Sequence, residues 1–190
     1  MQRTASLNRT PAKDNQAMNI RWKPSVTVAA VIARKHDGVT EFLLVEEHTP
    51  DGLRLNNPAG HLDPGESPLE GCARETLEET AFHFQPTALV GVYLSRFEKP
   101  VPGQAQTEDI TYLRFAFCGE LGEFVAGQAL DDGIVRTLWL SAEAIRVCPE
   151  RHRSPLLIKC MDDYLAGHRH PVDVITTDAS VYQIGKAAQR

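Results

Sequence analysis

The sequence predicts a mixed α/β (α+β) fold in a single domain, and three observations point to it. Apolar, β-branched runs of strand length recur along the chain, beginning with residues 26–33. Two segments, starting at Ser67 and at Ser154, instead carry the capping residues of helices. The 190 residues are 42% hydrophobic and 24% charged and show no repeat, which suits one compact core. We therefore expect one mixed sheet with two or three helices.

The N-terminal half of the predicted domain begins with a hairpin. Residues 26–33 form an apolar strand, the Lys-His-Asp-Gly segment at 35–38 has the composition of a turn, and residues 41–45 return as the partner strand. A short extended segment at 53–57 then leads into Pro58-Ala59-Gly60. This order places a glycine turn directly after a strand.

The first helix has a complete N-terminal signature. Pro64 and Gly65 make a turn, Ser67 is an N-cap residue, and Pro68 occupies the first helical position. Glu70 follows Ser67 by three residues and completes a capping box. We expect the helix to begin immediately after Ser67.

The C-terminal half continues with strands and two more helix starts. Strands are predicted at 88–97, 110–119 and 134–140, with a loop at 100–106 between the first two. Ser141 begins a capped helix, and Ser154-Pro155 begins the last one. The last helix has an apolar stripe formed by Leu156, Leu157, Cys160, Met161 and Tyr164.

Three glutamates on the first helix carry the chemistry. Glu75, Glu78 and Glu79 are spaced i, i+3 and i+4, so their carboxylates share one face and repel one another. A cation among them would relieve this repulsion, and hard oxygen ligands favour Mg²⁺, with Mn²⁺ as a substitute. The alternative for any one of them is a solvated surface acid, as in an ordinary Glu70–Arg74 pair. Taken together, they indicate metal-assisted hydrolysis of a phosphoanhydride.

The spacing around these glutamates resembles the Nudix box. Its fixed and apolar positions are matched by Gly60, Glu66, Arg74, Glu75, Glu78, Glu79 and Phe82. Two positions depart from the pattern. Thr76 replaces an apolar residue, although its methyl group can still pack, and Ala81 replaces the glycine that usually closes the helix. Because alanine pays about 1–2 kcal/mol for a left-handed conformation, we expect the helix to run one residue further or to end differently, without loss of a metal ligand.

The resemblance extends from about residue 22 to about residue 171. Segments similar to the phosphatase NudJ branch of the Nudix hydrolase superfamily lie at 23–29, 44–47, 57–62, 113–115, 139–143 and 153–156. The resemblance implies the α/β/α sandwich of this family with a mixed β-sheet. It also implies a bacterial, cytoplasmic hydrolase that releases orthophosphate from hydroxymethylpyrimidine pyrophosphate, thiamine pyrophosphate and some nucleoside di- and triphosphates.

The resemblance assigns roles to the box residues. Glu78 and Glu79 are expected to bind Mg²⁺ directly, together with the backbone carbonyl of Ala59. Glu75 either binds a second ion or orients and deprotonates the attacking water. All three glutamates are therefore candidate catalytic residues and metal ligands.

Other residues are expected to support the site or to contact substrate. Arg74, which belongs to the catalytic set, can fork onto Glu66 or Glu75 and hold them in place, and Gly60 and Glu66 are structural support. Arg54 and Arg114 are candidate substrate contacts, although exposed charges are an equal alternative. A further acid that completes the site remains open among Glu108, Asp109, Glu120, Glu123, Asp131 and Asp132.

Composition limits the partners and the compartment. The net charge of −5 argues against nucleic acid as the main partner, but not against a small phosphorylated substrate held through metal. Neither a membrane-spanning run nor the apolar core of a secretory signal is visible, and the four cysteines lack metal-site spacing, which together predict a cytoplasmic protein. The oligomeric state is left open as monomer or homodimer.

Residues 1–17 are polar and aperiodic, which predicts a disordered extension before a hydrolase domain at 18–172 and a C-terminal tail at 173–190. Two other functions remain as alternatives. One is a nucleotide or nucleotide-sugar pyrophosphatase that cuts internally. The other is a Nudix-fold binding module without catalysis, against which the intact glutamates argue.

Overall fold

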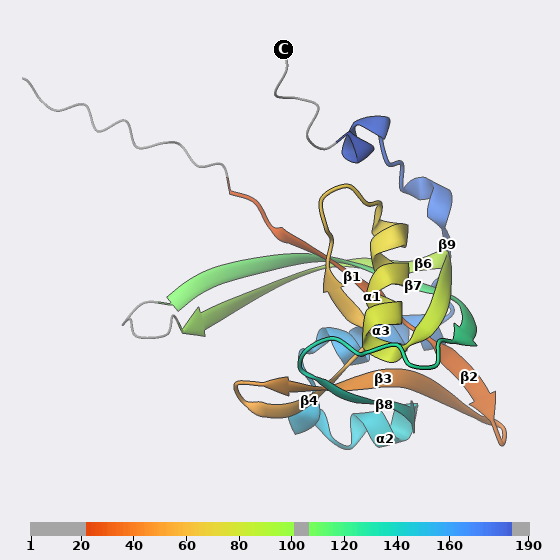
Figure 1. The fold of residues 1–190 in the computed structure, drawn as a ribbon. Coiled ribbons are helices and arrows are strands. Elements are labelled where there is room, and N and C mark those ends of the chain that lie inside the picture. Colours follow the sequence, from red (N-terminus) through yellow and green to blue (C-terminus); the bar gives the residue numbers. More distant parts are fainter. Residues whose placement is uncertain (1–21, 101–106, 184–190) are drawn as a thin grey trace, which may run out of the picture.

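The computed structural model describes residues 22–100 and 107–183, which form two β-sheets and three α-helices (Figure 1). The larger sheet has the strand order β5-β1-β7-β6-β9, and the smaller one the order β2-β3-β4, with β8 paired to β3. The larger sheet contains β5 (Ala59–His61), β1 (Ser25–Ala30), β7 (Thr107–Phe124), β6 (Phe82–Pro100) and β9 (His170–Pro171). The smaller sheet contains β2 (Ala33–His36), β3 (Val39–Thr49), β4 (Gly52–Asn56) and β8 (Ile134–Ser141). The helices are α1 (Pro68–Thr80), α2 (Ala142–Arg146) and α3 (Leu156–Leu165), with three short 3₁₀ turns, η1 (Pro149–Arg151), η2 (Val172–Val174) and η3 (Ala179–Tyr182).

Helices α1 and α3 cover opposite faces of the larger sheet (Figure 1). Successive residues of β1 alternate between the two layers, as the period of a strand requires. Val28 and Ala30 belong to the cluster that contains Cys72 of α1, whereas Ala29 belongs to the cluster that contains Cys160 of α3. The larger sheet is mixed, as predicted, because β1 runs parallel to β7 and antiparallel to β5. The prediction of a single sheet is wrong, because β2, β3, β4 and β8 form a second sheet that is antiparallel throughout.

The predicted strand at 26–33 is wrong in one respect, because the structure divides it between the two sheets. β1 ends at Ala30 and β2 begins at Ala33. At the crossing point the Val31 N–H donates to Phe117 O of the larger sheet, and Ile32 O accepts from Leu43 N of the smaller sheet. The run is apolar throughout because it passes between two cores, and the hydrophobic pattern alone cannot show the change of partner.

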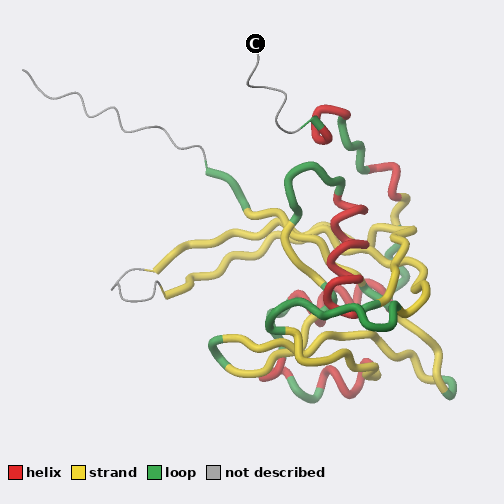
Figure 2. The backbone as a smooth tube through the Cα atoms, viewed as in Figure 1, coloured by secondary structure: helices red, strands yellow, loops and turns green. Residues whose placement is uncertain are grey.

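The hairpin formed by β6 and β7 is longer than the sequence predicts. β6 begins at Phe82, six residues before the predicted start at Ala88, and the hairpin extends well beyond the body of the molecule (Figure 2). The added segment contains Pro86, which cannot donate to a ladder. The pairing register of β6 shifts between Pro86 and Ala88, and this irregularity accommodates the proline.

Two of the three predicted helix starts are confirmed, whereas α3 begins at Leu156 after Pro155 and has no side-chain cap. Ser67 accepts a hydrogen bond from Glu70 N, and the Glu70 side chain accepts one from Ser67 N, which completes the capping box of α1. Ser141 caps α2 by accepting from Ala144 N. At its other end α1 stops at Thr80, and Ala81 adopts a left-handed conformation with φ 59° and ψ 17°. The expected extension of the helix by one residue does not occur.

Some predictions fall on residues outside the described part of the chain. These are the extension at 1–17 and residues 101–106 of the predicted loop. Among the residues that are described, no helix has both the length and the apolar character needed to cross a membrane. All four cysteines are free.

Candidate active site

Gly60 is required at its position because the Glu75 carboxylate occupies the space next to it. A Cβ atom at residue 60 would lie 2.1 Å from Glu75 Oε2, far inside van der Waals contact. Gly60 belongs to β5, and Glu75 projects from the third turn of α1. The glycine of the motif therefore allows the helix carboxylate to approach the backbone of the edge strand closely.

Arg74 holds three box glutamates with one guanidinium. Its Nε and Nη2 atoms donate to the two carboxylate oxygens of Glu66, at 3.0 and 2.7 Å. Its Nη1 atom donates to Glu75 Oε1 at 2.9 Å and to Glu78 Oε2 at 2.8 Å. A further bond from Nη2 to His61 O, at 3.0 Å, ties the group to β5. The predicted fork is confirmed, and it reaches Glu78 as well as Glu66 and Glu75.

Glu79, which is buried like Glu75, is held by the edge strand. Its Oε2 atom accepts a hydrogen bond from Ala59 N at 2.8 Å. Burial raises the pKa of Glu79 to about 8, and the negative charges of Glu75, Glu47 and Asp131 act in the same direction. A carboxylate in such surroundings is stabilised in its charged form by a nearby cation.

A further acid, Asp131 from the β7–β8 connection, lies next to the glutamates on this face of α1. One carboxylate oxygen from each of Glu75, Glu78 and Asp131 lies within 4.8 Å of the others. The loop is fixed to the helix because Asp131 N donates to Glu78 O at 3.0 Å. Three converging carboxylates, with Arg74 hydrogen-bonded to two of them, are a donor set suited to a hard divalent cation. The residues present therefore fit a Mg²⁺ or Mn²⁺ site.

Asp131 was one of six acids among which the sequence did not discriminate. In the structure it is the member of that group that meets the helix glutamates, within the part of the chain that is described. The other five, which lie away from this cluster, are Glu108, Asp109, Glu120, Glu123 and Asp132. The sequence carries no local signal for Asp131, because the β7–β8 connection brings it to the helix from more than fifty positions away.

The two predicted substrate contacts lie in different surroundings. Arg54 of β4 stands opposite Glu47 in the strand register, and its Nη1 atom donates to Leu53 O at 3.1 Å. Arg114 of β7 projects from the face of the larger sheet opposite to Leu113 and Phe115, and its Nε and Nη1 atoms are buried without a hydrogen-bond partner among the described residues. Glu47, for which the sequence predicts no role, contributes to the negative charge around both Glu79 and Arg114.

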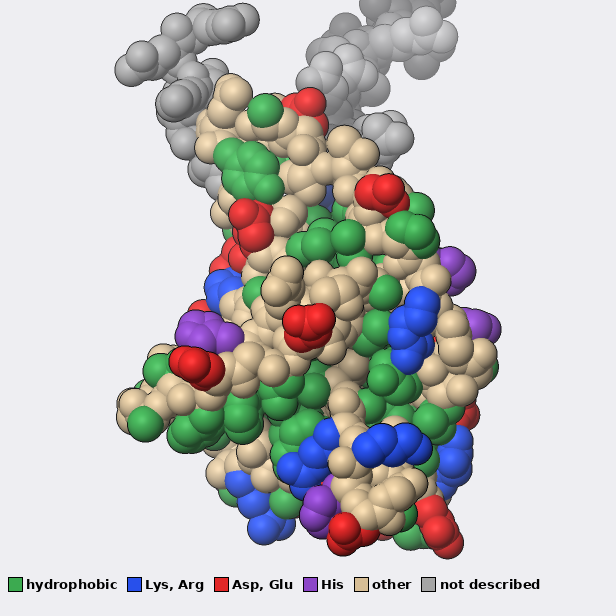
Figure 3. All heavy atoms as spheres, turned by 90° about the vertical axis from the view of Figure 1, so that its right-hand side faces the viewer, with side chains coloured by type: hydrophobic (Ala, Val, Ile, Leu, Met, Phe, Trp, Pro, Cys, Tyr) green, Lys and Arg blue, Asp and Glu red, His purple; other side chains and the backbone are tan. Residues whose placement is uncertain are grey.

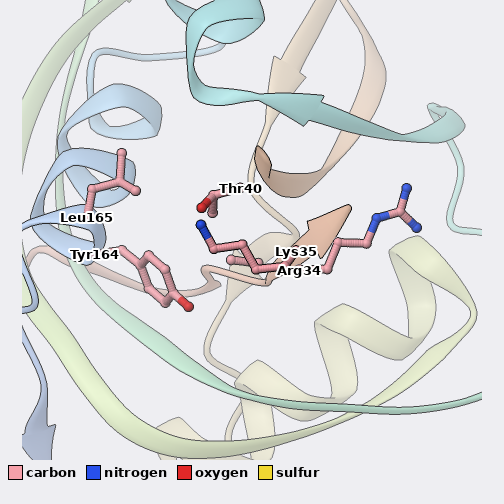
Figure 4. Close-up of a pocket in the computed structure, with 6 residues that line it drawn as sticks. Arg34, Lys35, Thr40, Tyr164 and Leu165 are labelled. Atoms are coloured by element: carbon pink, nitrogen blue, oxygen red, sulfur yellow. The ribbon is translucent and has the colours of Figure 1, made fainter. Parts of the chain in front are cut away.

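A separate hollow of about 240 Å³ lies between β2 and the end of α3 (Figure 4). Lys and Arg side chains gather at the level of β2 on the face shown in Figure 3. Arg34 in this hollow is already paired with Glu41 at 2.8 Å and stacked over Trp139 at 4.1 Å. Its lining contains no acidic residue, so we place the active site at the α1 carboxylates instead.

Comparisons with known proteins identify the family of the chain. The NUDIX domain model matches residues 23–158. Phosphatase NudJ of Escherichia coli (strain K12) is 34% identical over 154 residues, which cover 81% of this chain and 92% of that protein.

Solved structures give the same result. A NUDIX hydrolase from Nitrosomonas europaea is 44% identical, with a TM-score of 0.68, covering 82% of this chain and 98% of that one. The MutT protein from Methanosarcina mazei Go1 is 25% identical, with a TM-score of 0.53, covering 76% of this chain and 96% of that one. The predicted α/β/α sandwich is thereby confirmed as the fold of these hydrolases.

The match over most of the chain, the box residues around Arg74 and the converging carboxylates lead to one assignment. The chain belongs to the NUDIX family and is a NudJ-related hydrolase that acts on phosphoanhydrides of small phosphorylated substrates.

Proposed function

We propose that this hydrolase is a divalent-cation-dependent phosphatase that releases orthophosphate from small molecules carrying a pyrophosphate group. The proposed substrates are hydroxymethylpyrimidine pyrophosphate, thiamine pyrophosphate and nucleoside di- and triphosphates. The relationship to phosphatase NudJ supports the terminal-phosphatase outcome. The cluster of Glu75, Glu78 and Asp131 is the observation that carries the metal dependence.

The proposed ion is Mg²⁺, for which Mn²⁺ can substitute. Glu75, Glu78 and Asp131 would hold it on the basis of their geometry, and Glu79 and the Ala59 carbonyl remain the further ligands proposed from the sequence. A bound divalent cation would supply charge neutralisation of the phosphate oxygens and a water of lowered pKa.

The protein's own groups prepare this chemistry. Arg74 fixes the positions of Glu66, Glu75 and Glu78, so that little reorganisation is needed when substrate binds. Burial raises the pKa of Glu75, which makes its carboxylate a better proton acceptor than an exposed one. Glu75 is therefore suited either to accept a proton from the attacking water or to bind an ion, and both roles remain open.

The catalytic unit is proposed to be residues 18–172 of a cytoplasmic bacterial protein, acting as a monomer or homodimer. Arg54 and Arg114 are the proposed substrate contacts. Residues 173–190 are proposed to lie outside the catalytic unit.

A product assay tests the proposal. The purified protein is incubated with Mg²⁺ and with hydroxymethylpyrimidine pyrophosphate, thiamine pyrophosphate, nucleoside di- and triphosphates or ADP-ribose, and orthophosphate is separated from pyrophosphate and nucleoside monophosphate. We expect orthophosphate to be the main product, with turnover lost on chelation and restored by Mg²⁺ or Mn²⁺. Preferred internal cleavage of ADP-ribose or a triphosphate would show that the protein is a pyrophosphatase and not a phosphatase. Ligand binding without turnover would indicate a non-catalytic module.

A further inference from the structure

Arg114 lies in the middle of a polar row that crosses the larger sheet. The strand register places it beside Thr27 of β1 on one side and Tyr93 of β6 on the other, and Thr27 in turn is beside His61 of β5. Paired residues of neighbouring strands project from the same face, so these side chains form a line across four strands. The line lies on the face toward α3, because Ala29 and Ala116, two residues along the same strands, pack in the cluster that contains Cys160.

The guanidinium of Arg114 is buried without a compensating partner. Its Nε and Nη1 atoms are inaccessible to solvent and make no hydrogen bond with any residue that the structure describes. Burial lowers the pKa of Arg114, although the nearby negative charges of Glu47 and Glu79 act in the opposite direction. A buried cation with unmet donors destabilises a fold, and proteins retain such groups where a ligand completes them.

The polar side chains next to Arg114 either make hydrogen bonds with other residues or lack a hydrogen-bond partner themselves. Tyr93 donates its hydroxyl to Asp163 at 2.9 Å, and the other oxygen of Asp163 accepts from Lys159 at 2.6 Å. Thr27 Oγ1, directly beside Arg114, is buried and unpartnered. Ser95 Oγ, from the next row on the same face, is in the same condition. Two hydroxyls and a guanidinium thus present unused donors in one place.

The position of Arg114 relative to the carboxylates indicates which kind of ligand would bind there. Ala59, which holds Glu79, lies on β5 two residues from His61, and β5 is two strands from β7. At about 4.8 Å per strand the backbones of β5 and β7 lie roughly 10 Å apart. The Glu79 and Glu47 charges both act on Arg114, so the two sites share one electrostatic environment. A ligand with more than one phosphate can present one group to each.

We propose that Arg114, Thr27 and Ser95 form a phosphoryl subsite that holds a phosphate of the substrate other than the one under attack. The proposal rests on the phosphohydrolase function above and adds to it a binding site for a second phosphate of the same substrate. Charge-assisted hydrogen bonds from the Arg114 fork and the two hydroxyls would fix that phosphate in place. The same donors would take free inorganic phosphate, which is the probe used below.

A binding experiment tests the subsite without turnover. Thermal unfolding of the full chain is followed in chelator, with and without inorganic phosphate, for wild type, Arg114→Met and Arg96→Met. Arg96 is the matched control, because it is exposed on the adjacent strand and paired with Asp109 at 2.7 Å. Phosphate should raise the Tm of wild type and of Arg96→Met but not that of Arg114→Met. Without phosphate, Arg114→Met should unfold at a higher temperature than wild type, because a buried unpaired charge has been removed.

Kinetics provide the second readout. Arg114→Met should raise KM for a pyrophosphate-bearing substrate by roughly 10- to 100-fold and change kcat little, because the contact is equal in ground and transition states. Arg114→Lys retains the charge and should give an intermediate KM, which also covers the case in which Arg114→Met does not fold.

Three outcomes would overturn the subsite. They are equal phosphate-induced shifts of Tm in wild type and Arg114→Met, a lower Tm for Arg114→Met without phosphate, and an unchanged KM. An unchanged KM would leave the proposed function standing. A phosphate shift confined to proteins with Arg114, in a chain that hydrolyses none of the phosphoanhydrides, would support the subsite and refute the phosphatase.

Discussion

Arg74 concentrates much of the active-site geometry in one side chain. Four of its hydrogen bonds go to Glu66, just before α1, and to Glu75 and Glu78 on the helix. A planar guanidinium can make these bonds in fixed directions, whereas an ammonium group offers a point charge. The motif therefore specifies arginine for its shape as well as for its charge.

Replacing Arg74 with lysine tests this reading. Arg74→Lys should lower kcat/KM by about 10- to 100-fold, as is usual when a group that orients metal ligands is lost. It should also lower the free energy of unfolding by about 1–3 kcal/mol, because Glu66 loses its two-point contact. Steady-state kinetics and urea unfolding measure the two effects. Arg96→Lys, an exposed control, should change neither, and full activity in Arg74→Lys would contradict the orienting role.

Glu79 gives the metal-free protein a distinctive dependence of stability on pH. Its pKa in the folded state is raised to about 8, from an ordinary value of 4.5. Between these values the folded state binds a proton that the unfolded chain has released, so stability is full below the lower value and falls as pH rises toward the upper one. Urea unfolding in chelator across this window should show the decline in wild type. Glu79→Gln should reduce the slope while also lowering the catalytic rate by orders of magnitude. An identical slope in Glu79→Gln would show that another group titrates.

At the scale of elements, the end of α1 shows how a motif position can change without loss of the site. Ala81 takes the left-handed conformation that the glycine of the motif usually adopts, and its N–H still donates to Leu77 O. The surrounding structure therefore imposes the conformation on alanine at a cost of about 1–2 kcal/mol. The helix ends at the same point, and Glu79 keeps its place one residue before the end.

The strain at Ala81 should be measurable against a second alanine of the same helix. Ala81→Gly relieves it, but adds chain entropy to the unfolded state and removes a buried methyl group, so the net change should be near zero. Ala73→Gly has the same entropy cost and removes a less buried methyl group, but it relieves no strain. Ala81→Gly should therefore be about 1–2 kcal/mol less destabilising than Ala73→Gly in urea unfolding. Equal losses would mean that Ala81 is unstrained in solution.

The sequence predicts what is encoded locally and misses what depends on distant partners. The capping box at Ser67 and the shared face of Glu75 and Glu78 follow from spacing along one helix, and the structure reproduces them. The division of strand 26–33 between two sheets and the arrival of Asp131 at the helix depend on tertiary pairing. Composition and periodicity contain no signal for such pairing. The sequence therefore cannot distinguish Asp131, which lies next to Glu75 and Glu78, from the five other candidate acids.

For the whole molecule, the described C-terminal segment returns to the start of the catalytic helix. After β9 pairs with β6, Val172 and Ile175 pack against the core cluster on the α1 side. Tyr182 then donates its hydroxyl to Glu70 Oε2 at 3.0 Å, the same oxygen that accepts from Ser67 N in the capping box. The segment thus fastens the first turn of α1, whereas the carboxylates of the active site lie in its later turns.

This separation predicts that the C-terminal segment contributes to stability more than to catalysis. Deleting residues 173–190 removes the Ile175 contact and the Tyr182 hydrogen bond and should lower the free energy of unfolding by about 1–3 kcal/mol. Tyr182→Phe, which removes only an exposed hydrogen bond, should cost about 0.5 kcal/mol or less. At temperatures where both proteins are folded, kcat should match that of the full chain, because Glu75, Glu78 and Arg74 keep their contacts. A truncated protein with unchanged stability and a reduced kcat would instead give the segment a direct part in the reaction.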